Sequence, residues 1–183
     1  MERAIRAVAV FCGARDGVDP AYARAARDVG RTLADRGITV VYGGGGTGLM
    51  GAVANGALDA GGTVIGVIPE ALIGPELAHP DLAQLHVVGT MAERKAMMAE
   101  LADVFVALPG GTGTLEEIVE QWSWAMLGYH RKPCGFLDVQ GYWSPMRQLV
   151  DHMREQGFLS EAGASMIRFA ASLDPLLSAL EEA

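Results

Sequence analysis

The sequence predicts an α/β protein in which helices cover both faces of a mostly parallel β-sheet, in a single domain over residues 1–183. Three observations support this prediction. Half of the 183 residues are hydrophobic, as is typical of a globular chain with a sizeable core. Short apolar runs alternate with helical patterns along the chain. Two glycine-rich turns each connect such a run to a helix.

The predicted strands are short and continuously apolar, as expected of strands buried on both faces of a sheet. They cover residues 8–11, 38–42, 63–68, 85–88, 104–108 and 134–137. Residues 69–84, between the third and fourth strands, contain three prolines. We expect a long surface loop there, of the kind that often carries function.

The predicted helices fill the intervals between these runs and have recognisable ends. Asp19 and Pro20 supply an N-cap and a first-turn proline for a helix that reaches about residue 36, and Gly37 ends it. Thr90 and Glu93 form a capping box for another helix. Further helices are predicted over residues 49–60, 114–127, 142–156 and 174–182. Parallel strands need such crossover connections, so the alternation favours a parallel sheet.

The composition argues against several functional classes. A formal net charge of -8 disfavours non-specific binding to nucleic acid or to an anionic membrane. Cys12 and Cys134 stand far apart in apolar stretches, which indicates buried thiols in a reducing compartment instead of a disulfide or a metal pair. The first 17 residues lack the apolar core of a signal peptide. The longest uncharged run, residues 37–58, holds eight glycines and does not predict a membrane span. We expect a cytoplasmic location.

The first glycine-rich turn, YGGGGTGLMG, covers residues 42–51. Glycines let the backbone approach a ligand closely, and the amides at a helix start attract phosphate. Gly46, Gly48 and Gly51 also fit G-x-G-x-x-G, with Glu70 following 19 residues after Gly51, which is similar to a dinucleotide fingerprint. One match of this kind has little specificity, and the glycines could serve only close packing of the helix on the sheet. No Gly-Lys-Ser/Thr follows, so the turn is not a P-loop.

The second turn lies in ALPGGTGTLEEI, residues 107–118, and leads into a helix that opens with Glu116 and Glu117. Open α/β sheets bind ligands at the carboxyl edge of their strands. Two such turns therefore suggest one phosphate-bearing ligand of mononucleotide size between them. Acidic residues in a first helical turn also complement the helix dipole, so the two glutamates admit a purely structural explanation.

A helical wheel divides residues 114–127 into two sides. The predicted apolar stripe consists of Leu115, Ile118, Val119, Trp122 and Met126. Glu117, Glu120 and Trp124 fall on the opposite side. A large indole opposite the core suggests a second buried surface, which we interpret as the interface of a homodimer. A partner helix at this surface would desolvate Glu117.

Arg94 occupies a position in the apolar stripe of its predicted helix, with Met98 and Leu101 four and seven residues later. It could snorkel, with its stem on apolar surface and its guanidinium in water. Alternatively, the guanidinium points into a closed site and needs an anion there, such as a phosphate or the Glu117 carboxylate. In that hypothesis the glycine amides and Arg94 neutralise a phosphate. Glu117 then stabilises the oxocarbenium-like transition state of a breaking C–N glycosidic bond.

Three segments carry a family resemblance. Residues 109–117 match P-G-G-x-G-T-x-x-E, residues 91–95 match M-x-x-R-K, and residues 42–51 resemble Y-G-G-G-x-x-G-L-M-G. In this order they are similar to the motifs of the LOG ("lonely guy") family, the cytokinin riboside 5′-monophosphate phosphoribohydrolases. The resemblance covers residues 8–157.

The resemblance implies a Rossmann-like three-layer αβα fold, usually dimeric. It also implies hydrolysis of a nucleoside 5′-monophosphate, typically a cytokinin ribotide or AMP, to free base and ribose 5-phosphate without a metal or redox cofactor. By motif match Arg94 and Glu117 are the expected catalytic pair. The expected substrate-binding residues are Gly44, Gly45, Gly46, Thr47, Glu70, Met91, Arg94, Lys95, Gly110, Gly111, Thr112, Gly113, Thr114, Glu116 and Glu117.

The sequence departs from the family pattern at two places. Thr112 fills a variable position that is often aromatic, which leaves the base contacts open. Ala14 and Arg15 stand where the family often has the two serines of C-G-S-S. Two hydroxyls are thereby replaced by a methyl group and a cation. The family pattern therefore does not predict how these two positions contact phosphate or ribose.

Other functional classes fit the sequence less well. Family members are often labelled lysine decarboxylases, which need a lysine that binds pyridoxal phosphate. Here Lys95 belongs to the Arg-Lys motif, and Lys132 lies in a polar stretch. A non-catalytic nucleotide or cofactor carrier would gain nothing from Glu117. The fingerprint leaves a dinucleotide-dependent oxidoreductase as a further alternative. The four histidines are scattered without metal-ligand spacing, and no G-x-S-x-G turn occurs.

Overall fold

The central feature of the computed structural model, which describes residues 4–74, 78–82 and 84–183, is a β-sheet. Within these residues the sheet has seven strands in the order β4-β3-β2-β1-β5-β6-β7, and every pairing between them is parallel. The strands are β1 (Ala7–Phe11), β2 (Thr39–Tyr42), β3 (Val64–Pro69), β4 (Gln84–Val88), β5 (Val104–Ala107), β6 (Cys134–Leu137) and β7 (Ile167–Ala170). The predicted α/β class with a parallel sheet is confirmed.

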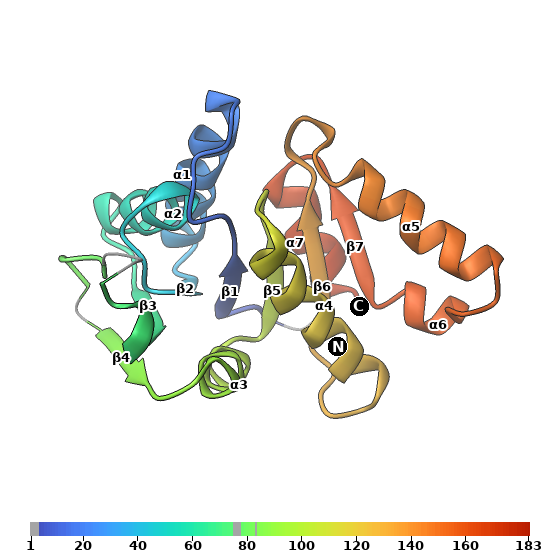
Figure 1. Cartoon of the computed structure of the whole chain (residues 1–183). Helices are drawn as coiled ribbons and strands as arrows, with labels where there is room; N and C mark the ends of the chain where they lie inside the picture. Colours follow the sequence, from blue (N-terminus) through green and yellow to red (C-terminus); the bar gives the residue numbers. More distant parts are fainter. Residues whose placement is uncertain (1–3, 75–77, 83) are drawn as a thin grey trace.

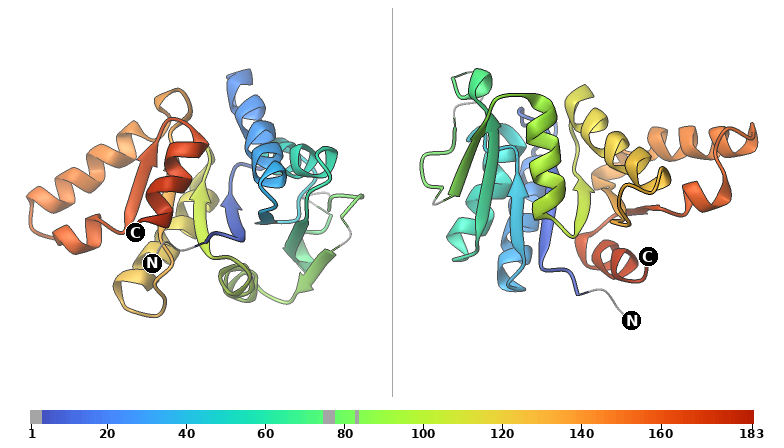
Figure 2. Two further views of the ribbon diagram at one scale, coloured as in Figure 1. Left: turned by 180° about the vertical axis from the view of Figure 1, so that it is seen from behind. Right: turned by 90° about the horizontal axis from the view of Figure 1, so that it is seen from below.

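Helices cover both faces of the sheet and complete three layers (Figures 1 and 2). On one face the core is formed with α1 (Pro20–Asp35), α2 (Gly48–Asp59) and α7 (Leu173–Glu181). On the other face it is formed with α3 (Met91–Leu101), α4 (Thr112–Met126) and α5 (Ser144–Glu155), and the short α6 (Glu161–Ala164) lies beside α5. None of the described helices is long and apolar enough to cross a bilayer.

The continuous apolar runs arise because both faces of the central strands are buried. In β1, Val8 and Val10 belong to the core on the α1 side, whereas Ala9 and Phe11 belong to the core on the α3 side. Successive side chains of a strand point to opposite faces, so every position must be apolar. Val10 lies in register with Tyr42 of β2 and Val106 of β5.

Some elements differ from the prediction. The strand β7 and the helix α6 were not predicted, because β7 has four residues, includes Arg168 and is only half-buried at the edge of the sheet. The predicted helix 142–156 begins at Ser144, after a 3₁₀ turn η2 (Val139–Gly141). The predicted loop 69–84 contains a 3₁₀ turn η1 (Glu70–Leu72) and a β-bridge from Ala78 to Gly45. Its residues 75–77 and 83 lie outside the described residues.

The buried stripe of α4 also differs from the prediction. It consists of Thr114, Ile118, Gln121, Trp122 and Ala125. Leu115 and Val119 are only partly buried, and Met126, which was predicted to be in the core, is 42% exposed because the helix ends there. The predicted core role of Met126 is therefore wrong.

The chain order of the strands creates a crevice at the carboxyl edge of the sheet. From β1 the chain proceeds outward through β2, β3 and β4, and then returns to β5 on the other side of β1. The connections that follow β1 and β5 therefore lead to helices on opposite faces of the sheet, α1 and α4. Ligands of open α/β sheets bind at such a switch point.

Candidate active site

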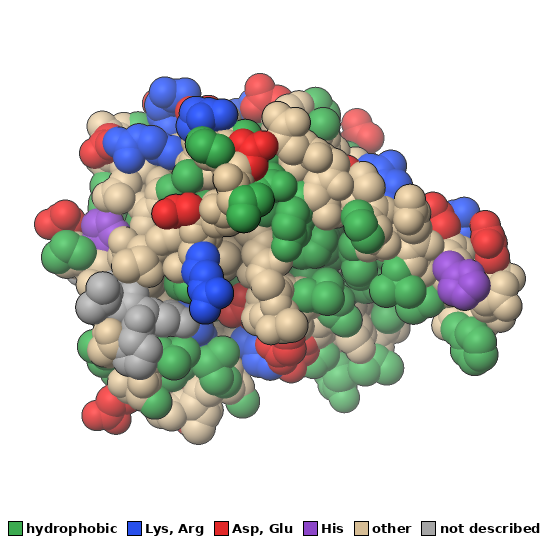
Figure 3. All heavy atoms as spheres, turned by 45° about the horizontal axis from the view of Figure 1, so that its top comes forward, with side chains coloured by type: hydrophobic (Ala, Val, Ile, Leu, Met, Phe, Trp, Pro, Cys, Tyr) green, Lys and Arg blue, Asp and Glu red, His purple; other side chains and the backbone are tan. Residues whose placement is uncertain are grey.

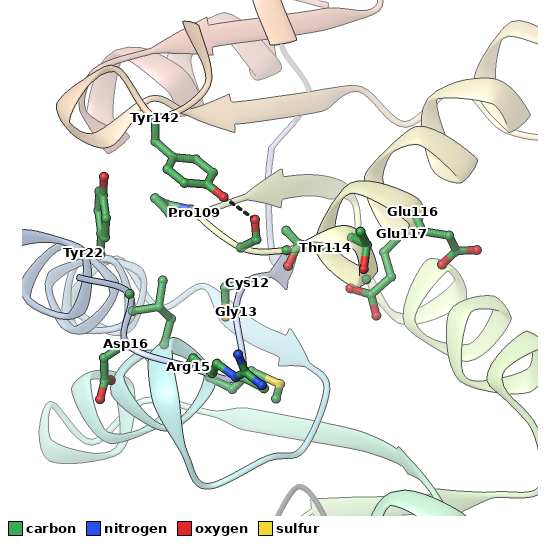
Figure 4. A pocket seen from close by; sticks show the side chains of 18 of the residues that line it. Cys12, Gly13, Arg15, Asp16, Tyr22, Pro109, Thr114, Glu116, Glu117 and Tyr142 are labelled. Carbon is green, nitrogen blue, oxygen red and sulfur yellow. Dashed lines mark hydrogen bonds between the residues drawn. The ribbon is translucent and has the colours of Figure 1, made fainter. Parts of the chain in front are cut away.

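A pocket of about 580 Å³ lies at this switch point (Figure 4). Its walls include residues 12–17, which follow β1, and residues 109–114, which follow β5 and form the second glycine-rich turn. Side chains near the starts of α3 and α4, among them Arg94 and Glu117, also line it. The segments 91–95 and 109–117, separated by about one helix and one strand in the sequence, thus meet in one cavity, and Leu49 and Met50 of the third motif also line it.

The start of α4 presents amides without a side-chain cap to this pocket. Gly111 is the N-cap residue and has no side chain that could accept from the first-turn N–H groups of Thr112, Gly113 and Thr114. A Cβ atom added to Gly111 or Gly113 would meet no other atom within 4 Å. Open space in front of a helix N-terminus suits an anion, because the amides and the helix dipole both favour negative charge.

Arg94 is buried, with only 4% of its surface exposed. Its Nε donates a hydrogen bond to the carbonyl oxygen of Val67 at 3.0 Å, and its Nη2 donates to the carbonyl oxygen of Gly43 at 2.8 Å. Its Nη1 lies 3.8 Å from the sulfur of Met91. The snorkelling alternative is therefore wrong. Backbone atoms of β3 and of the turn after β2 fix the plane of the guanidinium at the wall of the pocket.

The two glutamates of α4 point in different directions. In Figure 4 the Glu117 carboxylate is turned toward the pocket, whereas the Glu116 carboxylate is turned away from it. Burial raises the pKa of the Cys12 thiol at the pocket wall; the Glu117 carboxylate raises that pKa further, and the Arg94 guanidinium lowers it. Both charges therefore act on the same thiol at the wall of the pocket that they line.

Lys95 lies outside the pocket lining. Its Nζ donates hydrogen bonds to Glu116 and to Glu120, the latter at 3.0 Å, and so connects α3 to α4. Burial alone would lower the pKa of Lys95, but the two carboxylates outweigh it and raise that pKa. Glu120, which the helical wheel grouped with Glu117, belongs with Glu116 instead. A contact of Lys95 with substrate stays a prediction.

The glycines of the first turn do not line the pocket; Leu49 and Met50, which follow them, do. Gly44, Gly45, Gly46 and Thr47, expected to bind substrate, lie beside the loop that follows β1 and the loop before β4. The Thr47 hydroxyl donates to the carbonyl oxygen of Ala14 at 3.4 Å, His79 N donates to Gly44 O at 3.0 Å, and Gly45 pairs with Ala78. Substrate contacts of these residues stay predictions.

The remaining expected residues also divide into those that line the pocket and those that do not. Met91 lines the pocket, as do Gly110 to Thr114 and Glu116. Glu70 is exposed in η1 and is absent from the pocket lining, so the structure provides no support for the dinucleotide fingerprint.

Two aromatic residues of the pocket were missed in the sequence. Tyr22 of α1 and Tyr142, before α5, both line the pocket and meet edge to face, with ring centroids 5.6 Å apart. The Tyr142 hydroxyl donates to the carbonyl oxygen of Gly110 (Figure 4). Only the position of Tyr142 after a strand's carboxyl end could have indicated its role.

The pocket does not fit pyridoxal phosphate, which is held by a lysine. The chain has two lysines: Lys95 is committed to two glutamates, and Lys132 Nζ donates to the carbonyl oxygen of Ala99. Neither lysine lines the pocket. Among the described residues, no three His, Cys, Asp or Glu side chains are grouped so as to hold a metal ion.

Comparison with known proteins agrees with the motifs. The family model described as "Possible lysine decarboxylase" matches residues 50–180. The chain is 45% identical, over 96% of its length and 89% of the relative's, to the cytokinin riboside 5′-monophosphate phosphoribohydrolase of Rhodococcoides fascians. It is 44% identical, over 97% of its length and 82% of the relative's, to the phosphoribohydrolase LOG3 of Arabidopsis thaliana.

Solved structures extend the comparison to the fold. The molybdenum cofactor carrier protein of Chlamydomonas reinhardtii superposes with a TM-score of 0.70 over 96% of each chain, at 24% identity. This similarity concerns the fold alone, and it agrees with the expected Rossmann-like αβα architecture. With a family model that matches most of the chain and relatives at about 45% identity over nearly its full length, the chain belongs to the LOG family.

Proposed function

We propose that this protein hydrolyses the N-glycosidic bond of nucleoside 5′-monophosphates, such as AMP and cytokinin ribotides, and releases free base and ribose 5-phosphate. The relatives named above are called cytokinin riboside 5′-monophosphate phosphoribohydrolases. The observation that supports it most strongly is the sharing of one pocket by a buried arginine, a glutamate and an open helix N-terminus. Its volume of about 580 Å³ suits a mononucleotide.

In the proposed mechanism the second glycine-rich turn binds the 5′-phosphate. The amides of Thr112, Gly113 and Thr114 donate to it, and Arg94 supplies a positive charge. Because Val67 and Gly43 hold the guanidinium through their carbonyl oxygens, it is pre-oriented and needs little rearrangement when substrate binds.

Glu117 acts at the sugar. As the bond between C1′ and the base nitrogen breaks, the base takes the bonding electron pair and C1′ gains oxocarbenium character. The carboxylate stabilises that positive charge and accepts a proton from the water that attacks C1′. The hydroxyl group ends on C1′ and the proton ends on the departing base, so the products balance substrate plus one water.

The alternative is a non-catalytic carrier of a nucleotide or cofactor on the same scaffold. The similarity to the molybdenum cofactor carrier protein reflects the fold. A carboxylate beside a phosphate site weakens anion binding, so Glu117 in the pocket favours catalysis over transport. The deciding experiment incubates the purified protein with AMP, isopentenyladenosine monophosphate, GMP and CMP and measures free base by chromatography. Base release from one or more nucleotides supports the hydrolase, whereas tight binding without release supports the carrier.

We also propose that the chain forms a homodimer through the surface around Trp124. Trp124 is partly buried and packs edge to face on Tyr129, which is 76% exposed. Leu127, Leu149 and Phe158 are exposed as well, and hydrophobic side chains gather on the α5 side of the face in Figure 3. Light scattering should give twice the chain mass at micromolar concentration; a monomer would contradict the proposal. Buried thiols at Cys12 and Cys134 agree with the proposed cytoplasmic location.

A further inference from the structure

An ion-pair cluster between α3 and α4 lies directly behind the candidate catalytic pair. Lys95 Nζ contacts Glu116 and Glu120, which are one turn apart on α4. Lys95 is 9% exposed, and Glu120 Oε2 is buried with no hydrogen-bond partner among the described residues. Lys95 and Glu120 are therefore mostly shielded from water, where their interaction is strong and directional, whereas the side chain of Glu116 is 52% exposed.

On each of the two helices, a residue of the ion-pair cluster is the sequence neighbour of a residue of the catalytic pair. Arg94 precedes Lys95 on α3, and Glu116 precedes Glu117 on α4. Consecutive residues of an α-helix are rotated by about 100°, so a contact through Lys95 and Glu116 sets the direction in which Arg94 and Glu117 point. A small rotation of either helix would move both charges out of alignment with a bound ribose.

The position of Lys95 argues against a direct contact with the nucleotide. Unlike Arg94, it is absent from the pocket lining, and both of its carboxylate partners come from α4. A lysine that neutralised phosphate would gain nothing from two glutamates that already neutralise it.

We propose that Lys95 is a positioning residue: its ion pairs with Glu116 and Glu120 hold α3 against α4 so that Arg94 and Glu117 face one substrate. This inference rests on the proposed hydrolase function. Replacement of a buried ion pair is often neutral for stability, so the importance of the cluster lies in geometry. Misplacement of catalytic groups by about 1 Å lowers turnover by about 100-fold.

The first test compares Lys95→Met and Lys95→Arg with the wild type. Lys95→Met should lower kcat for AMP by about 10- to 100-fold while KM, and the AMP affinity measured by calorimetry, change by less than about twofold. Lys95→Arg, which retains the cation, should recover most of kcat. A tenfold weaker AMP affinity with unchanged kcat would instead identify Lys95 as a nucleotide ligand and overturn the proposal.

The second test exchanges the charges. Lys95→Glu places three carboxylates together and should abolish turnover. In the double variant Lys95→Glu with Glu120→Lys, an ion pair can form again. Its log kcat should recover by at least a third of the difference between Lys95→Glu and the wild type. Position 120 lies outside the pocket lining, so a lysine there could not take over a contact with phosphate, and any rescue would come from the ion pair. If the double variant folds but its kcat is not restored, the proposal is overturned.

The control exchange is Arg36→Asp with Asp174→Arg, an exposed pair between α1 and α7, which should leave kcat unchanged. If wild-type protein releases no base from any nucleotide tested, the proposed function fails. If the wild type is active and the Lys95 variants keep full kcat, only the positioning role fails.

Discussion

The two glycine-rich turns look alike in the sequence but use their glycines differently. In the first turn the space in front of four of the glycines is filled by the protein. A Cβ atom on Gly43 would lie 2.1 Å from Arg94 Nη2, and one on Gly48 would lie 2.3 Å from the carbonyl carbon of Ala14. In the second turn Gly111 and Gly113 face open space. Among the glycines of the second turn, only Gly110 resembles those of the first, because a Cβ atom on it would lie 2.1 Å from Thr114 Oγ1.

This difference separates scaffold from ligand site. Glycines of the first turn allow Arg94 and the loop after β1 to approach the backbone, so that turn supports the pocket from behind. Glycines of the second turn leave room for an anion at the start of α4. A glycine-rich turn between strand and helix is therefore compatible with phosphate binding or with internal packing, and only the atoms opposite each glycine distinguish the two.

The strongest test of the comparison concerns Glu117, which follows the open turn and turns its carboxylate toward the pocket. Glu117→Gln should lower base release from AMP by about 100- to 1000-fold, because the amide cannot stabilise positive charge or accept a proton. AMP binding, measured by calorimetry, should persist. Arg94→Ala should damage both binding and turnover.

Glu116→Gln is the matched control for Glu117→Gln. Its carboxylate contacts Lys95, so its loss should affect turnover less than the loss of Glu117. Full activity of the Glu117 variant would refute the catalytic role of that residue.

The second test addresses packing in the first turn. Gly48 has a φ of 59° and a close backbone neighbour, so Gly48→Ala should reduce the free energy of unfolding by about 2–4 kcal/mol in urea titration. Gly61 has a φ of 74° but no atom opposite it within 4 Å. Gly61→Ala should therefore cost only about 1 kcal/mol, from backbone strain alone. Equal losses in the two variants would show that contact with Ala14 is unimportant.

The third test addresses open space in the second turn. Gly113→Ala should keep or raise stability by up to about 1 kcal/mol, because alanine favours helices and nothing lies opposite. The same methyl group would crowd a phosphate at the helix start, so KM for AMP should rise about tenfold, or about 1.4 kcal/mol. An unchanged KM in a folded variant would show that the phosphate binds elsewhere than at this turn.

The smallest effect is expected at Thr47. Its hydroxyl makes one long hydrogen bond, and the residue lies outside the pocket lining. Thr47→Ala should change the free energy of unfolding by less than about 0.5 kcal/mol and leave kcat/KM for AMP unaltered. A tenfold loss of kcat/KM would restore the first turn as a direct phosphate ligand and so break the comparison.

Much of the fold could be predicted because its signals are local. The apolar runs identified β1, β2, β3, β5 and β6, since strands buried on both faces need apolar residues throughout. The exposed edge strand β4 was identified from the shorter run of residues 85–88. The half-buried edge strand β7 lacks that signal, and Arg168 interrupts its apolar pattern. Met126 fitted the helical period of α4. The period alone does not show where the surface that α4 packs against ends, so the exposure of Met126 could not be predicted.

The candidate site was predictable to a smaller extent. Motifs identified Arg94, Glu117 and the second turn, all of which line one pocket. They did not identify Tyr142, whose contact with Gly110 joins residues 32 positions apart. They also did not show that Lys95 turns toward α4, because the direction of a side chain around a helix depends on the element packed beside it.

The sequence by itself determined the class of fold, the order of its main elements and the family, because hydrophobic period, helix caps and short motifs are properties of neighbouring residues. Only the tertiary structure decided which glycines are opposed by other atoms and which face open space, and which of two adjacent glutamates turns its carboxylate toward the pocket. Those outcomes depend on atoms contributed by distant segments, which the strand order β4-β3-β2-β1-β5 brings to one edge of the sheet.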